Sequence, residues 1–135
     1  MIVSAFTLLA TALLFGGMTL YSFGFAAFVF TALPADTAGP LIRKAFPHFY
    51  LFVMGVSAIA ACGAAFIDPL SCALLIATVL STVYARQILM PAINDATDAG
   101  QTKRFKTRHL VSVLITLSHI AAAAVVLIRV AGAEG

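Results

Sequence analysis

The chain is dominated by four long apolar blocks that contain no Lys, Arg, Asp or Glu. They cover residues Ile2–Leu33, Phe46–Ile67, Pro69–Ala85 and Leu110–Ile128. A hydrocarbon core about 30 Å thick is crossed by roughly 20 helical residues, so each block is long enough to span, the third only if it continues toward Met90. The pattern predicts an all-α integral membrane four-helix bundle of antiparallel up-down topology, in a single domain over residues 1–135.

Composition supports a membrane location. The chain is 62% hydrophobic and only 10% charged, with a mean hydropathy of +1.08, whereas soluble domains are about half apolar and a quarter charged. No Lys or Arg precedes the first block, and its apolar run exceeds the roughly 7–15 residues of a signal-peptide core. We therefore expect it to remain as an uncleaved membrane anchor.

The positive charges separate to one side of this topology. Four crossings place the termini and the Asp68 turn on one side, and segments 34–47 and 86–109 on the other. Of the eight Lys and Arg residues, only Arg129 lies on the first side. Short loops rich in Lys and Arg stay in the cytoplasm, so the second side is expected to be cytoplasmic. The sequence thus predicts a plasma (inner) membrane protein with both termini periplasmic or extracellular. The seven residues on the other side are Arg43, Lys44, Arg86, Lys103, Arg104, Lys106 and Arg108.

The distribution of Lys and Arg also indicates which partners to expect. The net charge of +3 is explained by topology and by attraction to anionic lipid, so it calls for no nucleic acid. The expected partners are the lipid bilayer and either a second copy of the chain or a partner membrane subunit. Among the basic residues, we expect Arg86 to snorkel at the interface and Arg129 to stand near an open terminus.

Local signals predict where helices pack and turn. Small residues recur every seven positions in the first block, at Ala10, Gly17, Gly24 and Thr31, which favours a packing seam there. Residues 35–40 have the Pro, Gly and Asp content of a turn, so the second helix is expected to begin near Phe46–Pro47.

One polar stripe stands out in the fourth block. His109, Ser112, Thr116, His119 and Ala123 follow steps of three and four and share a helical face, with His119 about 15 Å deeper than His109. Polar groups inside a membrane face the bundle interior, so the stripe should point at the other helices. It fits either a polar site between helices or interhelical hydrogen bonds that fix the packing.

Other candidate groups are few. His48 lies at roughly the depth of His109, so a haem or metal held by two histidines is one interpretation and interfacial hydrogen bonding the other. Cys62 and Cys72 flank the Asp68 turn at similar depth and are either a disulfide pair or ordinary small apolar residues. Asp95 and Asp98, beside Lys103 and Arg104, suggest a charge-paired surface more than a cation site.

Several short motifs have a more specific implication. They are Phe30-x-x-Leu33-Pro34-x-x-Thr37-x-Gly39, Lys44-x-Phe46-Pro47-x-x-Tyr50, Ala85-Arg86 followed by Pro91, and Phe105-x-x-x-His109-x-x-Ser112. Together they resemble the transmembrane protein 205-like family, catalogued as a domain of unknown function with about four membrane helices. The resemblance implies this fold and no particular reaction; His48 and His119 lie outside the pattern. The positions it marks are Pro34, Thr37, Gly39, Lys44, Pro47, Tyr50, Arg86, His109 and Ser112.

Three classes of function fit these observations. The sequence favours a non-enzymatic membrane protein whose basic rim contacts lipid headgroups, a partner subunit or a small ligand. The alternatives are an oligomeric transporter or channel component, and a haem-binding oxidoreductase that uses His48 with His109 or His119. No catalytic set and no metal site is predicted, because the sequence has no phosphate-binding glycine loop, nucleophile elbow or paired intramembrane carboxylates; the cofactor stays open.

The charge asymmetry predicts the outcome of a topology experiment. A reporter enzyme that is active only in the periplasm should be active when fused after Gly135 and silent when inserted near Gly100. Reporter activity of both fusions, measured in whole cells, checks the orientation. Activity near Gly100 with silence after Gly135 would reverse it.

Overall fold

The computed structural model describes all residues 1–135, and every regular element in it is helical. Four helices are long and apolar enough to cross a membrane. This confirms the predicted all-α four-helix bundle. The four helices cover Ile2–Ala32, Ala35–Ala64, Pro69–Asp98 and Thr102–Gly132.

The first and third of these helices contain π-helical turns. The first consists of α1 (Ile2–Thr19), the π-helical η1 (Leu20–Phe25) and α2 (Ala26–Ala32). The third consists of α4 (Pro69–Tyr84), the π-helical η2 (Ala85–Leu89) and α5 (Met90–Asp98). The second and fourth are the uninterrupted α3 (Ala35–Ala64) and α6 (Thr102–Gly132).

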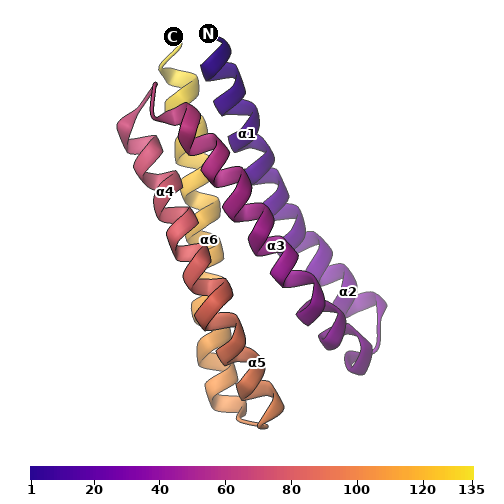
Figure 1. The fold of residues 1–135 in the computed structure, drawn as a ribbon. Helices are drawn as coiled ribbons and strands as arrows, with labels where there is room; N and C mark the ends of the chain where they lie inside the picture. Colours follow the sequence, from indigo (N-terminus) through magenta and orange to yellow (C-terminus); the bar gives the residue numbers. More distant parts are fainter.

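The helices form two hairpins, α1–α3 and α4–α6 (Figure 1). Both termini and the turn between α3 and α4 lie at one end, which we call the terminal end. The turns between α2 and α3 and between α5 and α6 lie at the other, the loop end. The two hairpins diverge toward the loop end (Figure 1), so packing between them is closest in the half of the molecule that holds the termini.

The second helix begins well before the predicted position. Residues 35–40 are not a turn, because α3 already starts at Ala35 and contains both Pro40 and Pro47. The carbonyl oxygen of Pro34 accepts hydrogen bonds from the backbone N–H groups of Thr37 and Ala38 at 3.0 and 2.8 Å and starts the helix. A longer helix satisfies backbone groups that a loop near the bilayer would leave to water, and this outweighs the local turn signals.

The turn between α5 and α6 is compact. Gly100 has a φ of +67°, a backbone conformation that a residue without a side chain adopts at little cost. The backbone N–H of Gln101 donates to the carbonyl oxygen of Ala96 at 2.9 Å, which closes the end of α5. α5 is thus the last part of the continuous membrane-length helix Pro69–Asp98.

The packing face of α1 differs from the predicted seam. Gly17 does lie against the Phe52 ring of α3, and a Cβ added there would come within 2.5 Å of it. Gly24 and Thr31 are exposed, however, because the π-helical turn adds a residue and rotates the helix beyond it. The buried face runs instead through residues at alternating steps of three and four, the spacing of a left-handed helix pair. These are Ser4, Thr7, Thr11, Leu14 and Met18.

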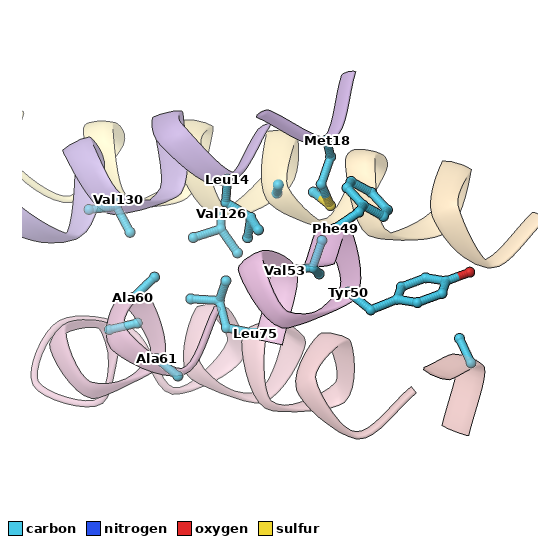
Figure 2. Close-up of a cluster of buried hydrophobic side chains, with 13 residues drawn as sticks. Leu14, Met18, Phe49, Tyr50, Val53, Ala60, Ala61, Leu75, Val126 and Val130 are labelled. Carbon is cyan, nitrogen blue, oxygen red and sulfur yellow. The ribbon is translucent and has the colours of Figure 1, made fainter. Parts of the chain in front are cut away.

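The core fills the space between the hairpins toward the terminal end. Figure 2 shows Leu14 and Met18 of α1, Val53 of α3, Leu75 of α4 and Val126 of α6 directed toward a common interior. Aromatic rings extend this core beside η1, where Tyr21 stacks on Phe49 with centroids 4.8 Å apart. Close van der Waals packing of these side chains therefore holds this half of the bundle together.

An ion pair ties the terminal end together. The Arg129 guanidinium donates from Nε and Nη2 to the two carboxylate oxygens of Asp68 at 2.7 and 2.9 Å. Asp68 also caps α4 by accepting from the Ser71 backbone N–H and hydroxyl. Arg129 lies close to the C-terminus, as expected, and this pairing with Asp68 is a contact that the sequence did not indicate. The Arg129 bond, together with those from Ser71, holds the pKa of the Asp68 carboxyl well below its usual range.

This arrangement predicts a pH-dependent stability. Because the folded-state pKa of Asp68 is lowered, its contribution is complete above the unfolded pKa of about 3.9 and is lost as the pH falls below it. Asp68→Asn should lower the unfolding temperature in detergent by roughly 2–4 °C at pH 7, and this difference should shrink below about pH 4.

The matched control is Asp36→Asn, since the carboxylate of Asp36 is exposed and forms no ion pair. Thermal unfolding followed by circular dichroism from pH 3 to 8 checks both variants. Equal effects of the two substitutions at pH 7 would contradict the structural role of Asp68.

Candidate functional site

A cleft of about 820 Å³ opens between the two hairpins at the loop end. One wall comes from the first hairpin and the other from α5 and α6. Its apolar lining extends along the helices into the membrane-spanning part of the molecule. That lining includes Phe23, Phe30, Phe46, Ile93, Val113 and Leu117.

An ion pair crosses the cleft where it approaches the loop end. Nη1 and Nη2 of Arg43 on α3 donate to the two carboxylate oxygens of Asp98 at the end of α5, at 2.7 and 2.9 Å. Both side chains remain solvent-accessible, 43% for Arg43 and 59% for Asp98. Asp98 was expected to pair with Lys103 and Arg104, but its partner comes from the other hairpin. This pair is the direct charged contact between the diverging ends of the hairpins.

Further polar side chains surround this pair. Asp36 on α3, and Asn94 and Thr97 on α5, line the same part of the cleft. The Asp36 carboxylate accepts a hydrogen bond only from the neighbouring Thr37 hydroxyl, at 3.4 Å. We call the polar group formed by Asp36, Arg43, Asn94, Thr97 and Asp98 the mouth of the cleft.

Hydroxyl groups lie deeper in the cleft. The Tyr50 hydroxyl is 3.4 Å from Oγ of Ser112, a contact that links α3 to α6. Figure 2 shows Tyr50 at the edge of the apolar core, with its hydroxyl directed away from the other labelled side chains. Thr116 and Ser22 also line the cleft, and the buried Oγ of Ser22 has no hydrogen-bond partner. The deep part of the cleft thus combines apolar walls with a few hydroxyls.

The predicted polar stripe of the fourth helix divides between two environments. His109, Ser112 and Thr116 line the cleft, where the His109 ring stacks on Phe105 with centroids 5.5 Å apart. His119 turns instead toward α4, where its Nε2 is 2.7 Å from the Ser81 hydroxyl and the residue is only 8% exposed. Val113 is exposed and also lines the cleft beside His109.

The remaining candidates lie apart from this cleft. His48 is exposed on α3 and is not among the lining residues, so the cleft does not bring it together with His109. Cys62 is an exposed thiol and Cys72 a partly buried one, with no bond between them. No cluster of His, Cys, Asp or Glu has the grouping of a metal site. The structure therefore gives no support to a Cys62–Cys72 disulfide, and of the two only Cys72 packs against the core.

The residues of the family motifs gather at the loop end. Gly39, Tyr50, His109 and Ser112 line the cleft. Arg86 is half-buried and its Nε donates to the carbonyl oxygen of Pro47 at 3.4 Å, so it joins η2 to α3. The sequence prediction missed the contribution of Asp36, Asn94 and Thr97, because isolated polar residues in a presumed loop carry no local signal for a shared cleft.

The two histidines of α6 should differ in their effect on stability. His119→Ala removes the bond to Ser81 inside the bilayer, where such bonds average about 0.6 kcal/mol and reach about 1.7. His109→Ala is the matched control, because that ring is exposed and makes no hydrogen bond within the protein. Chemical unfolding in detergent should show the loss for His119→Ala alone, and Ser81→Ala should add little to it. A larger loss for His109→Ala would contradict this assignment.

Comparison with known proteins agrees with the architecture. No curated protein and no solved structure matches the chain. A family model described as a domain of unknown function (DUF4149) matches residues 9–102, which include α3, α4, α5 and most of the first membrane helix. Because the match covers more than half of the chain, this four-helix membrane protein belongs to the DUF4149 family.

Proposed function

We propose that this chain is a non-enzymatic membrane protein that binds a bilayer phospholipid, with one acyl chain held in the cleft between its hairpins. The observation that carries the proposal is a cleft of about 820 Å³ whose walls are mainly apolar and whose mouth is charged. Ligand pockets in proteins measure about 300–1,000 Å³ and combine apolar walls with a few oriented polar groups.

The order of these features along the helices matches a lipid. The mouth lies at the loop end, where polar side chains reach the membrane surface, whereas Phe23 and Leu117 lie deeper along their helices. Charged groups are costly in the hydrocarbon region but favourable at the headgroup level. A phospholipid presents the same sequence of chemistry, with a charged headgroup followed by an apolar chain, and so matches both parts of the cleft.

The polar groups of the cleft are suited to binding more than to a reaction. The Ser112 hydroxyl has Tyr50 as its side-chain neighbour and no histidine or carboxylate within hydrogen-bonding distance, so it has no general base. A haem-binding oxidoreductase is less well supported, because His109 is the one histidine that lines the cleft. The oligomeric transporter has no specific observation in its favour.

We further propose that the mouth opens toward the cytoplasmic leaflet of the plasma membrane. Seven of the eight Lys and Arg residues belong to the loop-end half of the chain, which supports a cytoplasmic loop end and outward termini. Within the DUF4149 family, the motifs that include Pro34, Tyr50 and His109 support a closer kinship with transmembrane protein 205-like proteins. Several of the same motif residues line the cleft, which supports its assignment as the functional site.

Photo-crosslinking tests whether lipid enters the cleft. The probe is a phosphatidylethanolamine with a diazirine near the end of one acyl chain, added to the purified protein in detergent. We expect crosslinks at cleft residues such as Leu117 and Thr116. Val113→Trp places a large ring in the cleft and should reduce this labelling severalfold, because an acyl chain and the indole would compete for the same volume.

Leu114→Trp is the matched control, since Leu114 is the next residue on α6, is 53% exposed and does not line the cleft. It should leave the cleft crosslinks unchanged. Labelling spread evenly over lipid-facing residues such as Leu114 and Ile128, with no response to Val113→Trp, would overturn the proposed function.

A further inference from the structure

The mouth of the cleft carries charges of both signs. It has one guanidinium, that of Arg43, and two carboxylates, those of Asp36 and Asp98. Arg43 and Asp98 already pair with each other, which leaves the Asp36 carboxylate without a cationic partner. Carboxylates therefore outnumber the guanidinium at the mouth by two to one, although the chain as a whole has a net charge of +3.

The ratio of carboxylates to guanidinium at the mouth determines which lipid headgroup can bind there. A headgroup with negative charge alone would meet Arg43 but also two carboxylates, and like charges placed close together oppose binding. A headgroup with both a phosphate and an ammonium group matches the mouth better, because the phosphate is complementary to the Arg43 guanidinium and the ammonium group to the two carboxylates. A planar guanidinium binds two phosphate oxygens through two parallel N–H bonds, the same geometry in which Arg43 binds the carboxylate of Asp98.

We infer that the cleft selects a zwitterionic phospholipid whose headgroup ends in a primary ammonium group. The inference rests on the proposed lipid-binding function and specifies its substrate class. The phosphate replaces the Asp98 carboxylate on Arg43, and the ammonium group donates hydrogen bonds to the carboxylates of Asp36 and Asp98. A quaternary ammonium has no N–H donors, so a choline headgroup satisfies these carboxylates less well.

The outer surface of α6 has the opposite charge character and must be distinguished from the cleft. Lys103, Arg104, Thr107 and Arg108 form a separate basic surface near the start of this helix. That surface attracts anionic lipids from the surrounding leaflet through general electrostatics. Binding of total lipid would therefore report both locations, so the experiment must read the cleft alone.

Competition for the cleft crosslink provides this readout. The diazirine phosphatidylethanolamine probe is displaced by unlabelled phosphatidylethanolamine, phosphatidylcholine or phosphatidylglycerol with identical acyl chains, and crosslinks at Thr116 and Leu117 are quantified by mass spectrometry. We expect phosphatidylethanolamine to displace the probe at an at least fivefold lower concentration than phosphatidylglycerol, with phosphatidylcholine between them.

Two variants change the charge of the mouth. Asp36→Asn leaves the Arg43–Asp98 pair intact and should narrow the preference between phosphatidylethanolamine and phosphatidylglycerol. Asp36→Asn combined with Asp98→Asn should reverse it, because Arg43 is then the one charged side chain of the mouth. The control Lys103→Gln with Arg104→Gln alters only the outer surface and should leave the ranking at the cleft unchanged.

The outcomes separate the two proposals. Cleft crosslinks that all three lipids displace equally, or that phosphatidylglycerol displaces best, would overturn the headgroup selectivity and leave lipid binding in place. An unchanged ranking in Asp36→Asn and in the double variant, both shown to be folded by thermal unfolding, would also overturn it. Absence of cleft crosslinks sensitive to Val113→Trp would remove the proposed function and the selectivity together.

Discussion

A bilayer offers its proteins no hydrogen-bonding solvent, and most features of this chain follow from that constraint. The backbone is helical almost throughout, so its polar groups are satisfied within each segment. Side-chain hydroxyls obey the same rule, as when Thr78 and Ser118 donate to the carbonyl oxygens one turn earlier at 3.0 and 2.8 Å. The exceptions are informative. The hydroxyls of Ser22 and Ser112 make no such bond to the preceding turn, and both line the cleft. There the Ser112 hydroxyl contacts that of Tyr50, whereas the buried Oγ of Ser22 has no partner, as is also true of Ser57 outside the cleft.

The same constraint bears on how the helices of the two hairpins pack. Apolar side chains gain little by leaving lipid for one another, so close packing of small residues must hold membrane helices together. Near the terminal end, Gly63 lies directly against Thr7 and brings α3 close to α1. Toward the loop end the hairpins diverge, and rings such as Phe23, Phe30 and Phe46 line the cleft between them together with small residues, among them Ala26, Ala27 and Gly39. A single ion pair between Arg43 and Asp98 then crosses the space between them.

The sequence predicts the number and approximate extent of the helices, because charge-free blocks of this length have one stable form in lipid. It does not predict helix ends at the membrane surface, where α3 continues through Pro40 despite strong turn signals. The sequence also does not predict contacts between residues far apart in the chain. Asp98 pairs with Arg43, 55 positions away, although Lys103 and Arg104 are much closer in sequence. His109 and His119 do lie on one continuous helix at the predicted spacing. Because the partner helices contain π-helical turns and the hairpins diverge, however, His109 lines the cleft whereas His119 contacts Ser81.

The Asp68–Arg129 pair has a consequence for assembly of the protein during its synthesis. Asp68 emerges from the ribosome 61 residues before Arg129, so the first three membrane helices enter the bilayer while this carboxylate has only Ser71 as a partner. The last helix brings the missing guanidinium. The pair that joins the α3–α4 turn to α6 can therefore form only after all four membrane helices have been made, and a chain that ends before Arg129 lacks it.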